Sequence, residues 1–408
     1  MTKHTNTPAL RFSEFENDWK IVKLQELLCF NNGINASKDQ YGVGRKFINV
    51  LDILNNNFIT YNNIIGKVDV SEKVELNNKV EYGDMLFLRS SETREEVGLA
   101  NTYLDNKYAL FGGFVIRGKR IKEYSPLFLK ETLNKPRTRY EIGVAAGGST
   151  RFNVSQDILK NVTLYLPELE EQRKISNFFS KLDRQIELEE EKLELLEQQK
   201  RGYMQKIFSQ ELRFKDDNGN DYPNWENEKL GDLINEVNER TTSNNQYVLL
   251  SSTKNGLLSQ EEYFKKQIGS KDSTGYKILR LNQLVLSPQN LWLGNINFNQ
   301  RFDIGIVSPS YRIYNLSNQF DINFAKDLLK SPRYIYEYAQ ASEQGASVVR
   351  RNLNLELFYS IKISLPSIEE QRKIGAFLNK LDKLMRKQYN KIEVLKQRKQ
   401  GLLQKMFV

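Results

Sequence analysis

The sequence predicts an α+β protein in which two pseudo-symmetric globular domains are separated by two long helices that form an antiparallel coiled coil. Three observations predict this architecture: a nine-residue run that occurs twice, a helical spacing of hydrophobic residues after each copy, and short β-rich runs before each copy. A chain of 408 residues is also too long for one compact core. The expected divisions are a first globular domain at 1–166, a first helix at 167–210, a second globular domain at 211–365 and a second helix at 366–408.

The repeat is the strongest feature of the sequence. The run from Pro167 to Ile175 returns from Pro366 to Ile374, at an offset of 199 residues. The same offset relates two further matches: Lys181-Leu182-Asp183 with Lys380-Leu381-Asp382, and Gln205-Lys206-Ile207-Phe208 with Gln404-Lys405-Met406-Phe407. A weaker match opens each half, at Trp19 with Lys23–Leu27 and at Trp225 with Lys229–Leu233. The chain is therefore built from two copies of one unit.

The ends of the chain fit this repeat. The first helix runs on into Glu211–Phe214, and that segment resembles Ala9–Phe12 near the N-terminus. The second helix stops at the equivalent point, at Phe407. The sequence therefore resembles a circle that has been cut at one junction, and we expect the two termini to lie close together.

Hydrophobic residues after each copy follow the 4-3 spacing of a coiled-coil seam. The seam positions are Ile175, Phe179, Leu182, Ile186, Leu193, Leu196, Tyr203 and Ile207 in the first helix, and Ile374, Leu378, Leu381, Met385, Ile392, Leu395, Leu402 and Met406 in the second. About 40 residues in each helix give a length of about 60 Å. The equivalence of the two copies predicts that the helices are antiparallel and pack through these seams.

Polar residues interrupt both seams at equivalent steps, at Glu189 and Lys200 in the first helix and at Gln388 and Lys399 in the second. One register lets them meet: it places Glu189 beside Lys399, Lys200 beside Gln388, Leu193 on Leu395 and Leu196 on Ile392. In the alternative, the polar residues simply lie in solvent at the rim of the seam. The helices also differ in charge, with −2 over 167–210 and +7 over 367–408, which favours pairing and leaves basic side chains for a partner.

The composition excludes several kinds of site. One histidine (His4) and one cysteine (Cys29) cannot form a Cys/His zinc site or a histidine-dependent triad, and no phosphate-binding loop or dinucleotide fingerprint occurs. A metal site of Asp and Glu alone stays open, although their spacing suggests none. We expect no catalytic residue, no bound metal and a buried, inert thiol at Cys29. The single cysteine and the lack of a long apolar run predict a cytoplasmic protein without a membrane span.

The globular halves mix short strands, turns and helices. Strands are expected at Lys46–Leu51, Asp84–Arg89, Gly113–Arg117, Lys277–Leu281, Gln283–Ser287 and Ile304–Ile306, and helices near Ser125–Asn134 and Asp321–Glu337.

Polar and basic loops interrupt these strands at matching places in the two halves. Side chains of these types read base edges and hold phosphates, and the net charge of +9 is a modest attraction for a polyanion. For any single residue, a solvated loop is the simpler interpretation, but as matched sets they indicate DNA contacts. The candidates are Arg45, Lys46, Arg89, Ser90, Ser91, Arg94, Arg117 and Arg151 in the first half, and Ser287, Gln289, Asn290, Arg312, Arg350 and Arg351 in the second.

The duplicated Leu-Pro-x-x-Glu-Glu-Gln-Arg-Lys-Ile run, at Leu166–Ile175 and Leu365–Ile374, resembles the specificity subunits of type I restriction–modification enzymes. The paired endings and the opening Trp…Leu segments reinforce this resemblance, which covers nearly the whole chain. It implies two target-recognition domains, at 1–166 and 211–365, that each contact one half of a split, asymmetric site in double-stranded DNA. Base-reading residues vary within the family, so the loop residues above rest on this sequence alone.

The resemblance also implies the partners. The helix pair would set the spacer between the half-sites and dock two modification subunits, which carry S-adenosylmethionine and methylate adenine. Restriction subunits would carry the translocase and nuclease with ATP and Mg²⁺, so no cofactor is expected on this chain.

Two rival interpretations remain at this point. A coiled-coil scaffold without sequence-specific DNA binding explains the helices but not the matched polar loops. A single-chain methyltransferase or nuclease would need its own catalytic motif, and the sequence contains no Pro-Pro pair of the kind found in adenine-methylation motifs.

Overall fold

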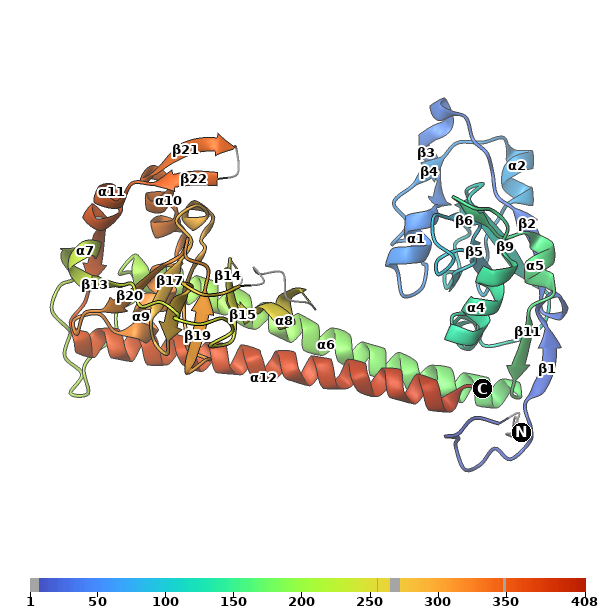
Figure 1. The fold of residues 1–408 in the computed structure, drawn as a ribbon. Helices are drawn as coiled ribbons and strands as arrows, with labels where there is room; N and C mark the ends of the chain where they lie inside the picture. Colours follow the sequence, from blue (N-terminus) through green and yellow to red (C-terminus); the bar gives the residue numbers. More distant parts are fainter. Residues whose placement is uncertain (1–6, 255, 265–271, 348–349) are drawn as a thin grey trace. The chain divides into compact units, whose positions relative to one another are not determined.

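Two units make up the chain, and each contains one globular domain together with one part of each long helix. The computed structural model describes residues 7–254, 256–264, 272–347 and 350–408 (Figure 1). The first unit comprises Met1–Leu188 and Ile392–Val408, and the second comprises Glu189–Lys391. Each unit therefore carries its own section of the helix pair, and each can be described by itself.

The first unit is centred on a four-stranded antiparallel sheet with the order β2-β9-β5-β7. Its strands are β2 (Leu28–Asn32), β9 (Val115–Arg120), β5 (Met85–Leu88) and β7 (Ala100–Thr102). The remaining strands are β1 (Lys20–Lys23), β3 (Tyr41–Ile48), β4 (Lys67–Val68), β6 (Ser90–Ser91), β8 (Leu110–Phe111), β10 (Phe152–Asn153) and β11 (Thr163–Leu166). The helices are η1 (Leu24–Glu26), η2 (Lys38–Gln40), α1 (Val50–Asn55), α2 (Glu72–Asn77), α3 (Pro126–Leu133), α4 (Pro136–Ala145) and α5 (Gln156–Lys160).

The second unit repeats this plan, with a four-stranded antiparallel sheet in the order β13-β20-β17-β18. Those strands are β13 (Ile234–Val237), β20 (Arg312–Leu316), β17 (Leu284–Leu286) and β18 (Ile296–Phe298). The others are β12 (Glu226–Lys229), β14 (Leu250–Thr253), β15 (Gly256–Ser259), β16 (Lys277–Arg280), β19 (Ile304–Val307), β21 (Ser342–Ser347), β22 (Arg350–Leu353) and β23 (Lys362–Leu365). The helices are α7 (Leu230–Leu233), α8 (Gln260–Phe264), η3 (Leu291–Leu293), α9 (Ile322–Leu328), α10 (Pro332–Gln340) and α11 (Leu355–Ser360).

Three local predictions are wrong, each for a physical reason. The strand expected at Lys46–Leu51 ends at Ile48, because Asp52 accepts a hydrogen bond from the Asn49 amide (2.7 Å) and so starts α1. The helix expected at Asp321–Glu337 is two helices, since Pro332 begins a new one at α10. Cys29 is exposed rather than buried, because alternate residues of β2 face opposite sides of the sheet.

The two long helices are confirmed. They are α6 (Leu169–Phe208, 40 residues) and α12 (Ile368–Met406, 39 residues). Ile175, Phe179, Leu182, Ile186, Ile374, Ile392 and Leu395 of the predicted seams are buried, and Leu193, Leu196 and Leu381 are half-buried. None of the helices in the described part of the chain is long and apolar enough to cross a membrane.

The helices are antiparallel within each unit, but the predicted register is wrong. In the second unit, Gln388 Nε2 donates to Glu189 Oε2 (2.6 Å). These two polar residues, which are equivalent positions of the repeat, therefore meet each other. Lys200 Nζ lies 2.6 Å from Asp382 Oδ1 rather than beside Gln388. The first unit contains the equivalent pair, with Lys399 Nζ 2.5 Å from Asp183 Oδ1. The seam pattern alone could not identify this register, because each lysine takes its carboxylate from a position outside the seam.

Candidate nucleic-acid interface

In the first unit the fold brings two of the predicted loops together. The first is the loop after β5, residues 89–98, which we call strand loop 1, and the second is the segment before α5, residues 147–153, which we call hairpin segment 1. Their strands β6 and β10 pair in an antiparallel ladder, with Phe152 opposite Ser91. Arg151 lies 3.9 Å from Glu92 at the exposed end of this ladder. Arg89, Ser90, Arg94 and Arg151 therefore belong to one surface, whereas Ser91 is buried.

The second unit brings the matching loops together. Strand loop 2 comprises residues 287–294 after β17, and hairpin segment 2 comprises β21 and β22, residues 342–347 and 350–353. The Arg351 amide donates to the Gln289 carbonyl at 3.3 Å, which joins the two segments. Gln289 is exposed, Asn290 and Arg351 are half-buried, and the Ser287 side chain is buried. The side chain of Arg350 lies outside the described residues.

The polar side chains of strand loop 1 differ in whether they are exposed or already hydrogen-bonded within the domain. Ser91 is buried and donates to Glu96 Oε2 (2.7 Å), and Arg89 Nη1 donates to the Gly113 carbonyl (3.1 Å). Arg94 is exposed, and so is Arg151 on hairpin segment 1. The exposed cations Arg94 and Arg151 are therefore the groups of this surface that a DNA backbone or base edge can reach.

Arg117 is a correction to the predicted set. Its side chain is 5% exposed and lies 2.6 Å from Asp84 Oδ2, in the interior of the four-stranded sheet. Burial raises the pKa of Asp84 even though Arg117 opposes that shift. Arg117 therefore neutralises a buried carboxylate and cannot reach DNA from this position.

Three other predicted residues lie apart from the loop surfaces. Arg45, on β3, pairs with Glu75 (2.9 Å) and covers the ring of Tyr108, and the Lys46 ammonium donates to the Ile64 carbonyl. Arg312, on β20, lies 2.6 Å from Glu236 Oε2 on β13. All three are half-buried and already paired, so as DNA contacts they are weaker candidates than the residues of the two loop surfaces.

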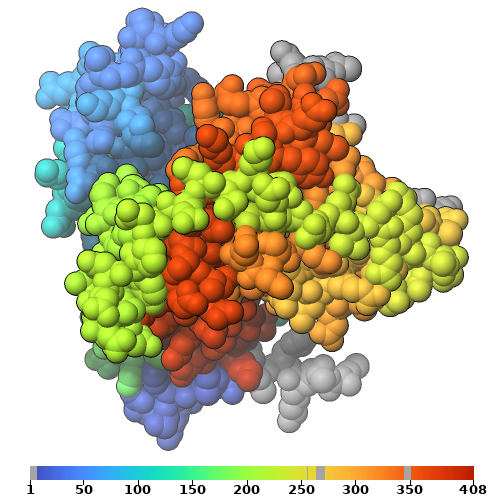
Figure 2. Space-filling view, turned by 90° about the vertical axis from the view of Figure 1, so that its left-hand side faces the viewer, coloured from blue at the N-terminus to red at the C-terminus, as the bar shows by residue number. Residues whose placement is uncertain are grey.

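Each domain is held on its long helix by a clamp between a half-buried arginine and a buried glutamate, which sequence reasoning missed. Arg11 Nε and Nη2 donate to the two oxygens of Glu171, both at 2.7 Å. Arg213 makes the equivalent pair with Glu370, at 3.2 and 2.7 Å. Both glutamates are 0% exposed, and the hydrogen bond to the glutamate raises the pKa of each arginine. In Figure 2 the yellow-green segment that follows α6 adjoins the orange-red start of α12, where the second clamp lies.

The glutamine of the repeated run makes a second link in each unit. Gln172 accepts a hydrogen bond from the amide of Ser125, the residue before α3, at 3.1 Å. Gln371 accepts one from the amide of Asp321, the residue before α9, at 2.9 Å. The repeated Glu-Gln pair therefore fixes the position of the globular domain on its helix. The similarity between Ala9–Phe12 and Glu211–Phe214 was the sequence signal for the arginines.

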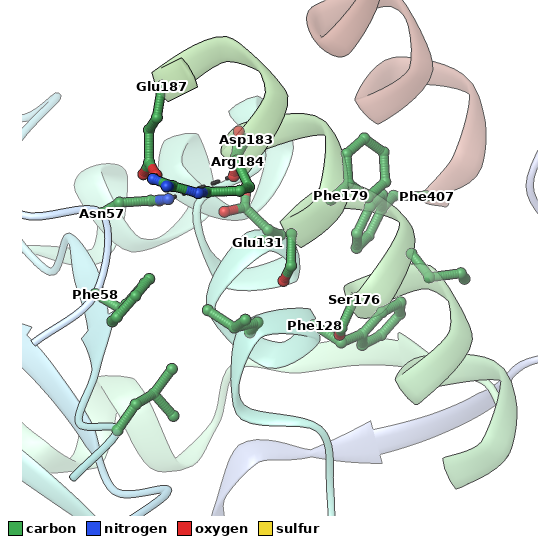
Figure 3. A pocket seen from close by; sticks show the side chains of 14 residues that line it. Asn57, Phe58, Phe128, Glu131, Ser176, Phe179, Asp183, Arg184, Glu187 and Phe407 are labelled. Carbon is green, nitrogen blue, oxygen red and sulfur yellow. Dashed lines mark hydrogen bonds and ion pairs between the residues drawn. The ribbon is translucent and has the colours of Figure 1, made fainter. Parts of the chain in front are cut away.

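The repeated ending is part of the same attachment. In the first unit Phe407, at the end of α12, stacks on Phe128 of α3 with the ring centroids 4.9 Å apart. These rings and Phe179 of α6 line a cavity of about 290 Å³, and Asp183 and Glu187 lie at its polar rim (Figure 3). The Leu10 amide also donates to the Lys405 carbonyl (2.8 Å), which confirms that residues near the two termini lie together.

In the second unit, Lys200 of α6 links the globular domain to both long helices through two ion pairs. Its ammonium lies 2.7 Å from Asp327 on α9 and 2.6 Å from Asp382 on α12, and its side chain is 13% exposed. Burial opposes the charge on Lys200, but the two carboxylates outweigh burial and raise the pKa of Lys200. Burial also raises the pKa of Asp382, but Lys200 and Lys326 outweigh it, so the net shift is downward. Both predicted positions of Lys200 are therefore wrong: it does not lie in solvent at the rim of the seam, and it does not pair with Gln388.

We predict that Lys200→Met lowers the free energy of unfolding by about 3 kcal/mol at neutral pH, because two partly buried carboxylates lose their cation. The raised pKa of Lys200 stabilises the fold below pH 10.5, and the lowered pKa of Asp382 stabilises it above pH 3.8. The stability lost in the variant is therefore largest between these two pH values. Burial raises the pKa of Asp327, so the pH range in which this carboxylate is charged and pairs with Lys200 begins at a higher pH. Urea unfolding at several pH values measures this, with exposed Lys206→Met as the control. A loss independent of pH down to pH 3 would contradict the charge assignment.

Within the described ranges, no three His, Cys, Asp or Glu side chains come together in a way that could hold a metal ion.

Comparisons with known proteins follow the repeat. Residues 16–198 and 222–394 each match the family described as the type I restriction modification DNA specificity domain. A putative type I restriction enzyme MjaX specificity subunit from Methanocaldococcus jannaschii is 23% identical over 430 residues, which cover 98% of this chain and 96% of the relative. The MjaVIII specificity subunit of the same organism is 25% identical over 303 residues, covering 68% of this chain and 67% of its own length.

Two solved structures share the fold of this chain. One is the S subunit of a type I restriction-modification system from M. genitalium, with a TM-score of 0.56, 16% identity, and coverage of 98% of this chain and 99% of that one. The other comes from work on complex assembly and conformational transition of the type I R-M system. It has a TM-score of 0.55, 16% identity, and coverage of 95% and 97%.

Proposed function

The chain belongs to the family of type I restriction-modification DNA specificity proteins, and from this membership we propose that each of its two units reads one half of a bipartite, asymmetric DNA site. Specificity subunits are non-catalytic parts of these enzymes, so the contribution of this chain is sequence recognition. The S-adenosylmethionine used for adenine methylation would be held by two modification subunits, and ATP and Mg²⁺ by restriction subunits.

The observation that carries this proposal is the pairing of a strand loop with a hairpin segment in both units. In each unit a polar loop from the central sheet meets the segment that links two helices, and main-chain hydrogen bonds join them. The loops differ in sequence between the units, whereas the clamps that hold the domains are the same. Equivalent surfaces with different side chains are what recognition of two different half-sites requires.

The helices supply the second part of the proposal, the docking of modification subunits. Leu195 on α6 and Val394 on α12 occupy equivalent positions of the repeat, and they are 57% and 62% exposed. Leu188 and Leu384 are 48% and 44% exposed. Uncovered aliphatic side chains on a long charged helix favour a protein partner, because their burial stabilises a complex.

The test is to replace residues 1–166 with the corresponding domain of another specificity subunit and to map methylated adenines in a host that also expresses the modification subunit. We expect the bases of one half-site to change and those of the other half-site and the spacer length to stay the same. Replacing 211–365 in the same way is the matched control and should change the opposite half. A site that stays unchanged after both replacements would support the scaffold alternative.

A further inference from the structure

Both units contain an arginine stacked on an aromatic ring where the strand loop meets the hairpin segment. In the first unit the guanidinium carbon of Arg94 lies 4.6 Å from the centroid of the Phe152 ring. In the second unit the guanidinium carbon of Arg351 lies 4.4 Å from the Trp292 ring. Guanidinium groups bind aromatic faces through dispersion and through attraction to the π-electrons.

Each arginine is also tied to the same point of the same helix. Arg94 Nη1 donates to the Gly143 carbonyl near the end of α4, and Arg351 Nη1 donates to the Ala339 carbonyl near the end of α10, both at 3.3 Å. Gly143 and Ala339 are equivalent, because each lies seven residues after the proline that begins its helix. A cation at the C-terminal end of a helix is favoured by the helix dipole. Three segments therefore meet at one guanidinium in each unit.

The two stacks exchange the positions of their residues. In the first unit the arginine comes from the strand loop and the ring from the hairpin segment, whereas in the second unit the ring comes from the strand loop and the arginine from the hairpin segment. Phe152 and Arg351 are equivalent, since each lies three residues before the residue that caps the next helix. The interaction is thus the same in both units, while the segment that supplies the arginine is not.

We propose that this stack is a staple that holds the strand loop and the hairpin segment as one rigid recognition surface in each unit. Arg94 and Arg351 are then positioning residues for half-site recognition. An arginine that only read a base would need to stay on the segment that approaches that base. A staple needs only that the ring and the guanidinium come from opposite segments, which both units satisfy. This inference rests on the proposed reading of one half-site by each unit.

The exchange itself provides the experiment. Arg94→Ala removes the staple of the first unit, and the double variant Arg94→Trp with Phe152→Arg rebuilds it in the arrangement of the second unit. Each variant is expressed with the modification subunit, and the methylated adenines of the host DNA are mapped. For Arg94→Ala we expect base preference to fall about tenfold across the first half-site, with the second half-site unchanged. The double variant should restore most of the preference.

Four controls make the outcome decisive. Arg94→Lys keeps the charge but not the planar stack, so it should resemble Arg94→Ala. Thermal unfolding of each variant chain should stay close to that of the wild type, and amide exchange in residues 89–98 should be faster only when the stack is absent. Trp292→Ala should relax the other half-site instead.

Two results would overturn the staple. One is an unchanged first half-site in Arg94→Ala. The other is loss of preference at a single base that the double variant does not restore, which would make Arg94 a direct base contact. A wild-type complex that methylates no split motif would instead overturn the proposed function, and the inference with it.

Discussion

Replacing Glu370 with alanine is expected to lower the free energy of unfolding by about 3 kcal/mol, because it leaves the half-buried Arg213 cation without its anion. The Glu370 side chain is 0% exposed and accepts hydrogen bonds from Arg213 and from Trp225 Nε1, at 2.7 and 3.1 Å. Without it, both donors lose an acceptor in a site that water reaches poorly. The loss is measured by urea unfolding at neutral pH.

The neighbouring residue provides the matched control. Glu369 lies on the same turn of α12 but is exposed, so Glu369→Ala should change the stability by less than about 0.5 kcal/mol. Arg213→Met combined with Glu370→Met should recover much of the loss, because an apolar pair of similar size needs no partner. If Glu369→Ala and Glu370→Ala had equal effects, the clamp would not hold the domain. In the assembled complex, Glu370→Ala should also weaken recognition of the second half-site more than the first.

Adding one heptad to both long helices is expected to lengthen the spacer of the DNA site and to leave both half-sites unchanged. Seven residues restore the seam to the same face and add about 10 Å of helix. At 3.4 Å per base-pair step, the spacer can grow by at most about three base pairs. The insertions belong directly after Glu189 and directly before Gln388, because these two residues meet and the inserted segments then face each other.

The control for this prediction is the same insertion in α6 alone, which should misalign Lys200 with Asp382 and prevent assembly of an active complex. Mapping of methylated adenines measures the spacer in each case. An unchanged spacer in the double insertion would mean that the helix pair does not set the distance between the half-sites.

The architecture could be predicted because it depends on periodicity. The offset of 199 residues and the 4-3 spacing run through both helices, and the structure has those helices within two residues of the expected bounds. The register could not be predicted in this way. Lys200 is placed by Asp382 and by Asp327, and Asp327 belongs to the globular domain rather than to the helix pair. A seam pattern contains no information about that third partner.

The candidate interface was predictable as two sets of loops but not residue by residue. Arg94, Arg151, Gln289 and Arg351 lie on the surfaces where loops meet, and their contacts with DNA remain predictions. Arg117 is the same residue type, but it lies on β9 and forms a buried ion pair with Asp84, the residue before β5, which only the folded structure shows. The two arginine–glutamate clamps were missed because their glutamates have no distinctive sequence signal. Glu171 and Glu370 look like ordinary acidic first-turn residues until Arg11 and Arg213 are placed beside them.

We propose that one chain reads two halves of one DNA site, and sequencing of methylated adenines in a host that expresses this chain with its modification subunit tests this directly. We predict a split motif with one modified adenine in each half, separated by a spacer of fixed length. A stable complex that produced no new methylation, or a continuous motif without a spacer, would contradict it.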